Sequence, residues 1–307
     1  MRERIAIVGS GVSGLGCLRF LHAHHDVTVF DHDTRPGGHA HTIDVTEPDT
    51  GRALPMDTGF MVFNEVTYPH LCRLFKELGV KPKQTSMSFA VRHDPTGLEW
   101  CGSSLNHLFA QRRNLFSLRF WKLLLQINKF NKLAKIEWQS TEAETTSLRD
   151  WCARKGFGQD FLNLYLIPMS AAVWSTPADK MLGFPAAALM RFFHNHGFLG
   201  LDTQHQWLTL EGGSRTYVDA VLKAYPADFR FGQGVTSVRR DGDQVVVATA
   251  HGEERFDRVI MASHADTTLK LLTDANGEER RLLGAFTYNQ NVAIVHTDMA
   301  PLPRTAK

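Results

Sequence analysis

The N-terminal part of the chain combines short apolar runs with one stretch of helical spacing. Residues 4–8 and 27–30 are rich in apolar and β-branched side chains, as buried strands are. Between them, residues 13–25 place Leu15, Leu18 and Leu21 at helical intervals. A strand, a helix and a second strand in so few residues predict a βαβ unit with parallel strands.

The rest of the chain turns from mixed to helical patterns and then back to β-rich ones. Helical spacing dominates residues 104–198, where Ser147 and Asp150 predict a helix start and Gly156 a helix end. Further helices are expected at 68–78, ended by Gly79, and at 214–224; strands are expected at 86–101, 234–240, 244–250 and 257–262, with short β-like pieces in 37–65. This order predicts an α/β fold interrupted by a mostly helical insert.

Composition narrows the class of protein. The apolar fraction of 43% and charged fraction of 21% exclude a disordered chain, a coiled coil and a collagen-like repeat. The net charge of +2 gives no electrostatic reason to expect a nucleic-acid partner. Four cysteines without a Cys-x-x-Cys pair indicate neither a zinc site nor a disulfide framework. With no signal peptide and no apolar run of roughly 18 residues, we expect a cytoplasmic protein.

A glycine motif follows the first expected strand directly and opens the expected helix. In this G-x-G-x-x-G, Gly9 allows a tight turn, Gly11 lets a pyrophosphate approach the backbone, and Gly14 allows close packing of helix and strand. An acid, Asp31, follows 22 residues after Gly9, near the spacing for a ribose contact, and it disfavours a 2′-phosphate. The alternative is a glycine-rich turn that binds nothing. The residues assigned to the nucleotide are Gly9, Gly11, Val12, Ser13, Gly14, Asp31 and His32.

A second glycine pair, Gly37-Gly38, follows shortly after Asp31. With it the sequence resembles the flavin-binding branch of the Rossmann fold, the amine oxidase and phytoene desaturase type. In those families the pair brings backbone close to the FAD diphosphate and ribityl chain, and an arginine usually follows. Here the next residue is His39.

Later segments make the resemblance more specific. They look like those of NAD/FAD-binding, amine-oxidase-like proteins whose genes often neighbour cyclopropane-fatty-acid synthase genes. The resemblance implies FAD as cofactor, with Asp57, Thr58 and Gly59 near the flavin ring, backbone groups of Val235 at the adenine, and strand 257–262 beside the pyrophosphate turn. The segments that carry it are 37–42, 56–64, 168–175, 192–197 and 212–218.

The resemblance also implies a division of the chain. A Rossmann-type FAD-binding domain, doubly wound and with a β-meander, is expected in two parts, 1–85 and 207–285, around a substrate domain at 86–206. Residues 286–307 would begin a second, incomplete substrate-domain segment, because relatives continue past a motif like His296-Thr297-Asp298 into a C-terminal strand and a Gly-Asp motif. A fragment, a truncated gene product and a short form completed by a partner all remain open.

No catalytic residue is assigned, because a flavin carries the electrons and the protein chiefly orients and polarises. The histidine pairs at 39/41 and 194/196 lack a third ligand at motif spacing, so no metal is expected. Trp174, His194 and His196 fall where the family's substrate cavity would lie, and ordinary core packing is the alternative.

One stretch departs from the neutral balance of charge. Residues 105–136 contain no acid and seven basic side chains, Arg112, Arg113, Arg119, Lys122, Lys129, Lys132 and Lys135. On a helical wheel Phe116, Phe120, Leu123, Ile127, Phe130 and Ala134 share one face. The pattern fits an interfacial helix in peripheral contact with the inner membrane face, or a packed helix with a solvated basic side.

The leading hypothesis is therefore an FAD-dependent oxidoreductase that moves a hydride from an apolar, lipid-linked or amine substrate to flavin. The alternative is a truncated, non-catalytic nucleotide-binding or scaffold protein at a membrane or lipid-modifying complex. A third interpretation is non-redox flavin chemistry of the sugar-mutase type. The oligomeric state stays open.

Overall fold

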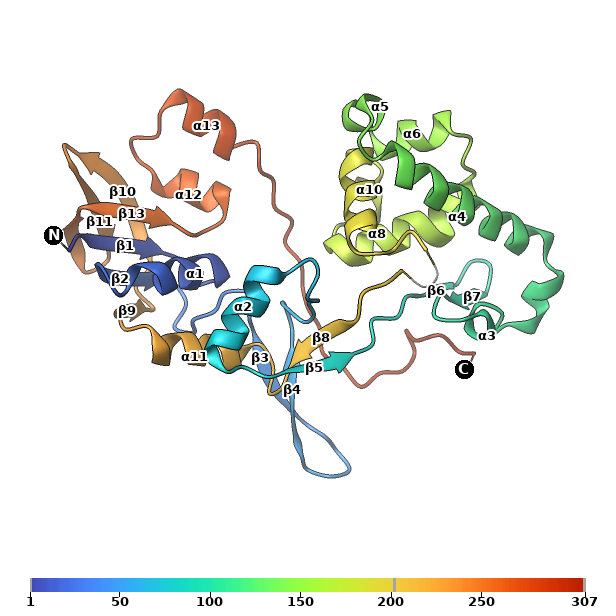
Figure 1. Cartoon of the computed structure of the whole chain (residues 1–307), viewed down its shortest axis with the longest axis horizontal. Helices are drawn as coiled ribbons and strands as arrows, with labels where there is room; N and C mark the ends of the chain where they lie inside the picture. Colours follow the sequence, from blue (N-terminus) through green and yellow to red (C-terminus); the bar gives the residue numbers. More distant parts are fainter. Residues whose placement is uncertain (1, 201–202, 306–307) are drawn as a thin grey trace. The chain divides into compact units, whose positions relative to one another are not determined.

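The computed structural model describes residues 2–200 and 203–305, and the chain divides into two compact units (Figure 1). The first, the nucleotide unit, contains residues 2–63, 68–84 and 208–295. The second, the helical unit, contains residues 64–67, 85–207 and 296–305. The chain thus leaves the nucleotide unit near residue 84 and returns to it near residue 208, beside the boundaries expected at 85/86 and 206/207.

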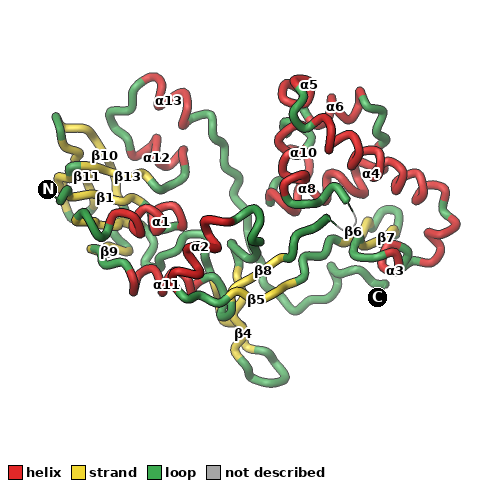
Figure 2. Tube along the Cα trace, viewed as in Figure 1, coloured by secondary structure: helices red, strands yellow, loops and turns green. Residues whose placement is uncertain are grey.

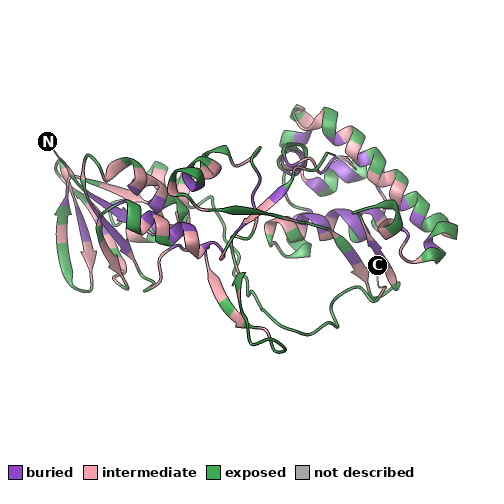
Figure 3. Cartoon of the chain, turned by 60° about the horizontal axis from the view of Figure 1, so that its bottom comes forward, coloured by how far each residue is buried: buried purple, intermediate pink, exposed green. Residues whose placement is uncertain are grey.

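A parallel sheet forms the centre of the nucleotide unit. Its strand order is β13 (Arg258–Met261), β1 (Arg4–Val8), β2 (Asp26–Asp31) and β9 (Asp228–Phe231), and each neighbouring pair is parallel. β1 is buried on both faces, which explains its unbroken apolar run (Figure 3). The predicted βαβ unit and the late strand beside it are confirmed, and β9 is a strand that the sequence patterns missed.

One face of this sheet is covered by helices α1 (Val12–Leu21), α2 (Pro69–Leu78) and α11 (Arg215–Ala224). Ile7 and Val29 of the sheet pack there with Leu15 and Leu18 of α1. α2 ends at Gly79, whose φ of 68° is left-handed as the sequence predicted. α1 ends at Leu21 rather than His25, and the guanidinium of Arg2 donates to the carbonyl of His25 at 3.0 Å.

The opposite face is covered by an antiparallel meander of β10 (Val235–Asp241), β11 (Gln244–Thr249) and β12 (Gly252–Phe256). Phe30 and Ala6 of the parallel sheet pack there against Val247 and Phe256. The predicted hairpin between β10 and β11 is confirmed. The sequence patterns missed β12, because three of its five residues are charged and Glu253 pairs with Arg239 across the sheet instead of packing in a core.

Further elements complete the nucleotide unit. β3 (Thr42–Thr46) and β4 (Ala53–Asp57) form a hairpin, and β5 (Pro82–Thr85) pairs with β8 (Trp207–Leu210) where the chain passes between the units. Helices α12 (Ala265–Leu271) and α13 (Gly277–Leu283) follow β13.

The helical unit is mostly helical (Figure 2), and its core is a cluster of aromatic rings. Phe130 is fully buried and packs against Trp151, Phe161 and Phe193 at ring-centre distances of 5.6–6.2 Å. The elements are the hairpin β6 (Ala90–His93) and β7 (Leu98–Cys101), then α3 (Leu105–Leu108), η1 (Arg112–Phe116), α4 (Leu118–Glu137), α5 (Thr141–Thr145), α6 (Leu148–Arg154), α7 (Gln159–Phe161), the π-helix η2 (Leu162–Leu166), α8 (Ile167–Trp174), α9 (Ala178–Met181) and α10 (Ala186–Asn195). The predicted start and end of α6 are confirmed, since the Ser147 hydroxyl accepts from the backbone of Asp150 and Gly156 has a φ of 71°.

The basic stretch 105–136 is not one helix, which corrects the helical-wheel prediction. It forms α3, η1 and most of α4, and a new helix begins after Ser117, whose hydroxyl accepts from the backbone of Phe120. Phe120 and Phe130 are buried on the inner face of α4 as predicted. Phe116 lies upstream of the cap in η1 and is 89% exposed, so it does not join that face. Across the described residues, no helix has the length and apolar content needed to cross a bilayer.

Candidate functional site

Two glycines of the G-x-G-x-x-G motif are required by packing within the protein. Gly9 has a φ of 110°, and a Cβ there would lie 2.8 Å from the carbonyl oxygen of Ala262, just after β13. A Cβ on Gly14 would lie 1.9 Å from the carbonyl oxygen of Gly9. These contacts hold β1, α1 and the end of β13 together, as the motif predicts.

The middle glycine, Gly11, is different because a Cβ on it would meet no protein atom within 4 Å. Gly11 is the N-cap of α1 and has no side chain to cap the helix, and the first turn holds no acid. The N–H groups of a helix's first turn have no intrahelical partner and carry the positive end of the helix dipole. The α1 N-terminus, with Val12 and Ser13 exposed, therefore offers free donors and free space to an anion.

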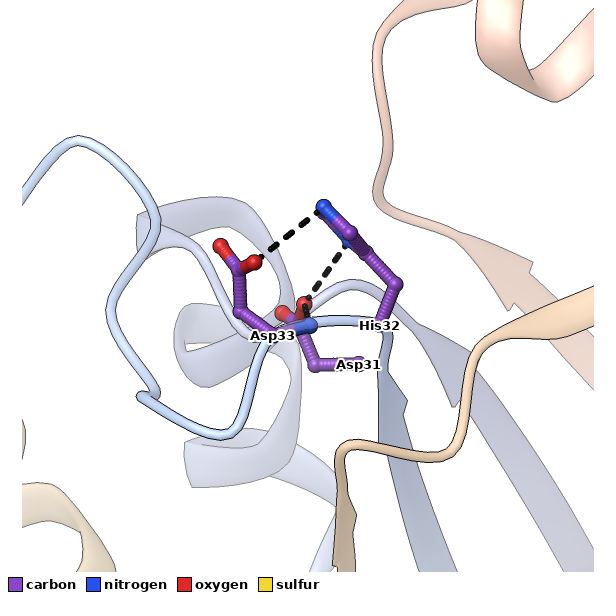
Figure 4. A group of neighbouring side chains, drawn as sticks. All are labelled: Asp31, His32 and Asp33. Carbon is purple, nitrogen blue, oxygen red and sulfur yellow. Dashed lines mark hydrogen bonds and ion pairs between the residues drawn. The ribbon is translucent and has the colours of Figure 1, made fainter.

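At the end of β2, the carboxylate of Asp31 is held in place by the first loop. Its Oδ2 accepts from the backbone of Ser10 at 2.7 Å and from the Ser10 hydroxyl at 2.5 Å. Its Oδ1 accepts from the backbone of Asp33 at 3.0 Å and lies 3.2 Å from Nδ1 of His32 (Figure 4). Asp31 is thus oriented beside the α1 N-terminus. Ser10 is a site residue that the sequence reasoning missed, because its position in the motif accepts any residue type.

The side chains in Figure 4 also form a small cluster of metal-type ligands. Nε2 of His32 lies 3.3 Å from Asp33, and the three residues' ligand atoms lie within 4.8 Å of one another. His32 and Asp33 are largely exposed, with 82% and 51% of their side chains accessible. Among the described residues this is the one such group, and it includes neither of the histidine pairs weighed from the sequence.

The second glycine pair lies directly against the first loop. The backbone N–H of Gly37 donates to the carbonyl of Ser10 at 3.0 Å, and a Cβ on Gly38 would lie 3.2 Å from the Cα of Gly11. The guanidinium of Arg35 donates to the carbonyls of Gly38 and Ala40 at 2.9 and 3.0 Å and so holds the loop in shape. Arg35 was not assigned from the sequence, although its position just before Pro-Gly-Gly was a usable signal.

The side chain of His39 reaches the loop that follows β13. Its ring stacks on that of His264 at 5.7 Å, and His264 stacks on Tyr288 at 4.3 Å with an interplanar angle of 3°. The Tyr288 hydroxyl accepts from the backbone of Ala265 at 3.0 Å. The rings thereby link the two loops that lie on either side of the α1 N-terminus.

Asp57, Thr58 and Gly59 lie against this glycine loop, and the carboxylate of Asp57 serves the fold. It accepts from the Thr42 hydroxyl at 2.6 Å and from the Ser214 backbone and hydroxyl at 2.9 and 2.7 Å, which fastens β4 to the start of α11. Thr58 donates its backbone N–H to the carbonyl of His41, and a Cβ on Gly59 would lie 2.3 Å from the carbonyl oxygen of His39. Their place near a flavin ring remains a prediction.

Val235 begins β10 at a point where the strand register shifts. The preceding residue, Gly234, approaches His32 so closely that a Cβ on it would lie 3.1 Å from the His32 Cβ. The backbone of 234–235 therefore borders the same end of β2 as Asp31. Gly11, Asp31, Gly38 and Val235 come from four separate segments and gather at the carboxyl end of the parallel sheet, where open α/β sheets bind ligands.

The candidate cavity residues Trp174, His194 and His196 belong to the helical unit, and all three make aromatic contacts. Trp174 packs on Phe192 at 4.6 Å, and the exposed His194 stacks on Trp138 at 5.2 Å. His196 is buried, stacks on Phe192 at 3.8 Å, and has Nδ1 2.9 Å from the Phe192 carbonyl oxygen. Of the three, only His196 is a core residue, whereas Trp174 is half-buried and His194 is exposed.

Burial of His196 predicts a pH-dependent stability. Desolvation lowers the pKa of His196 below its usual value, so the unfolded chain binds the proton more readily than the folded one. Stability is then highest above the unfolded pKa of about 6.5 and falls as the pH drops through it. We expect urea midpoints to decrease between about pH 7.5 and about pH 5.5, less steeply in His196→Phe. The exposed neighbour His194→Phe is the control, and equal slopes in all three proteins would contradict the prediction.

Solved structures share this fold over most of the chain. They include cyclohexylamine oxidase from Brevibacterium oxydans IH-35A (18% identity, TM-score 0.70), putrescine oxidase with putrescine bound (17%, 0.66) and a CLA-producing fatty acid isomerase from P. acnes (17%, 0.64). Each alignment covers 92% of this chain and 63% of the other, so this chain spans less than two thirds of their length. At these identities the likeness establishes the fold.

The sequence itself gives the family. No curated protein matches the sequence of this chain. A family profile described as flavin-containing amine oxidoreductase matches residues 13–298, which is most of the chain. FAD is the cofactor of that family, and the free donors of α1, the open space at Gly11 and the oriented carboxylate of Asp31 fit its adenosine diphosphate part. The chain belongs to the flavin-containing amine oxidoreductase family.

Proposed function

We propose that this protein is an FAD-dependent oxidoreductase that takes a hydride from an apolar, lipid-linked or amine substrate. The observation that carries the proposal is the uncapped N-terminus of α1, with open space at Gly11 between the Asp31 carboxylate and the Gly37-Gly38 loop. Such an arrangement suits the diphosphate and ribose of a dinucleotide.

Each part of the cradle has a role in holding the cofactor. The first-turn N–H groups at Gly11, Val12 and Ser13 would donate to the diphosphate, and Asp31 Oδ1 would accept from the ribose hydroxyls. The backbone at Val235 would border the adenine, while Gly38 lets the second loop approach without a side chain. FAD supplies hydride acceptance when bound, so the protein needs neither a nucleophile nor a metal for that step.

The substrate class is suggested by the proteins that share the fold. The structures that share the fold act, by their names, on cyclohexylamine, putrescine and a fatty acid. An amine and an unsaturated fatty acid are therefore the first substrates to test.

The test begins with the purified chain and its spectrum. We expect the absorbance of oxidised flavin, retained or restored by added FAD, and bleaching when cyclohexylamine, putrescine or an unsaturated fatty acid is added without oxygen. A colourless protein that takes up no FAD would overturn the proposal. Bound FAD that no member of a broad amine and lipid panel bleaches would favour the non-catalytic alternative.

The Asp31 carboxylate provides a quantitative prediction for cofactor affinity. Asp31→Asn keeps the shape but removes the charge, and a hydrogen bond to a charged acceptor is stronger than one to a neutral acceptor by about 1–1.5 kcal/mol. We expect FAD to bind about tenfold more weakly, as measured by titration of flavin fluorescence. Asp33→Asn is the matched control, since Asp33 contacts His32 but not the first loop. Equal losses in the two variants would contradict the assigned role.

A further inference from the structure

The outer surface of η1 and α4 in the helical unit exposes large apolar side chains. Phe116 is 89% exposed, Leu118 86% and Leu125 67%. The inner face of α4 is buried through Phe120 and Phe130, so the exposed residues are not part of the core seam. We call the exposed positions Leu115, Phe116, Leu118, Trp121, Leu125 and Ile136, together with the basic residues between them, the η1–α4 surface.

Lysines stand between these apolar positions on the same side of the helix. Residues 118, 122, 125, 129, 132 and 136 follow one another at intervals of three or four and are all exposed. Three of them are apolar (Leu118, Leu125 and Ile136) and three are lysines (Lys122, Lys129 and Lys132). Lys122, Lys132 and Lys135 form no hydrogen bond or ion pair with any described residue. Their charges are therefore available to a partner.

The remaining cations are partly committed within the protein. Arg119 forms a two-point ion pair with Asp160, and Lys129 donates to the carbonyl of Lys155. Arg113 donates to the carbonyl of Gly97 at 2.7 Å, a bond that leaves its charge uncompensated. Even when the negative charge of Asp160 is included, the net charge of the η1–α4 surface stays strongly positive.

A cavity of about 300 Å³ opens beside the same residues. Phe120, Leu123 and Leu164 provide apolar walls, while Arg113 and Arg119 bring guanidinium groups and Phe116 contributes its exposed ring. Apolar walls beside guanidinium groups match a molecule that carries an anionic group on an apolar body, as a phospholipid does.

We propose that the η1–α4 surface binds an anionic lipid bilayer, with Phe116, Leu118 and Leu125 inserted among the acyl chains and the lysines at the headgroups. Lysine is depleted at the centre of protein interfaces, whereas here it occupies three of the six positions of the exposed stripe. At a bilayer the same mixture of apolar side chains and lysines is favourable, because lysine extends its charged end to the headgroups while neighbouring apolar side chains are buried. Nucleic acid would leave the apolar side chains in water.

The test is vesicle binding by the full chain. We expect co-sedimentation with vesicles of phosphatidylcholine and phosphatidylglycerol, much weaker binding to phosphatidylcholine alone, and release as salt rises from about 0.1 M to about 0.5 M. Equal binding to both vesicles, or to neither, would overturn the proposal.

Matched charge-reversal variants test whether the η1–α4 surface makes the contact with the vesicle. The triple change Lys122→Glu, Lys132→Glu and Lys135→Glu should weaken binding to the anionic vesicles at least about a hundredfold, because each cation near such a surface contributes roughly a factor of five. The control alters the net charge equally at three exposed lysines of the nucleotide unit, Lys76→Glu, Lys83→Glu and Lys223→Glu, and should retain most of the binding. Equal losses in both triples would show a net-charge effect and overturn the assignment.

A second pair of changes separates insertion from electrostatic adhesion. Leu118→Gln and Leu125→Gln together keep every cation and remove two exposed apolar side chains, so folding should be unaffected. We expect about tenfold weaker vesicle binding and loss of any binding that survives high salt. Unchanged vesicle binding would overturn insertion. A wild-type dimer in gel filtration that becomes monomeric in this variant would assign the surface to a second copy of the chain instead.

Discussion

Replacing Gly11 by alanine leaves the protein folded and weakens FAD binding by about a hundredfold. The added Cβ meets no protein atom within 4 Å, and Gly11 already has a φ of −67°, which alanine adopts without strain. The same methyl group would stand where the diphosphate approaches the α1 N-terminus, and the displaced anion would lose charged hydrogen bonds of about 1.5–3 kcal/mol each. Titration with FAD measures the affinity, and urea unfolding measures the stability.

Gly16→Ala in the same helix is the control. Position 16 is also open, with no atom within 4 Å of an added Cβ, but it lies beyond the first turn of α1. We expect unchanged FAD affinity and a gain in stability of about 0.5–1 kcal/mol, because alanine favours the helix over glycine. If Gly11→Ala binds FAD as tightly as Gly16→Ala does, the diphosphate does not lie at α1.

Alanine at Gly14 has the opposite effect to alanine at Gly16. Its Cβ would lie 1.9 Å from the carbonyl oxygen of Gly9 and 3.1 Å from the side chain of Ile7, so the helix must move away from β1. Displacing buried backbone in this way destabilises by about 3 kcal/mol, at the upper end of overpacking effects. The free energy of unfolding in urea is the measurement.

Gly14→Ala and Gly16→Ala should thus change the free energy of unfolding in opposite directions and by different amounts. A Gly14→Ala protein as stable as Gly16→Ala would show that the turn between β1 and α1 is looser than the close backbone contact implies. FAD affinity should fall in Gly14→Ala as well, because the donors of the first turn move with the helix.

The parts of the fold that could be predicted from the sequence are those with local causes. The β1–α1–β2 unit, the Gly79 end of α2 and the β10–β11 hairpin each follow from periodicity or turn residues within a few positions. β9 and β12 were missed because two of the four residues of β9 and three of the five residues of β12 are charged. Their pairing is decided by distant partners and not by their own patterns.

The residues of the candidate site also divide into those with a local sequence signal and those without one. Gly9, Gly11, Gly14 and Asp31 lie within one local unit whose spacing has a mechanical reason. By contrast, Asp57 and Ser214 are 157 residues apart. No local sequence pattern predicts that the carboxylate of Asp57 fastens β4 to α11. Ser10 donates to the Asp31 carboxylate from a motif position that accepts any residue type, whereas Arg35 could have been noted from its place just before Pro-Gly-Gly.

The position of β13 in the sheet has a consequence for how the protein is made. β1 pairs with β13, yet about 250 residues separate them along the chain, and most of the helical unit is synthesised in between. At 5–20 residues per second, one edge of β1 waits roughly 12–50 s on the ribosome for its partner. The helical segment can fold first, while the unpaired edge of β1 stays exposed to aggregation until β13 has been synthesised.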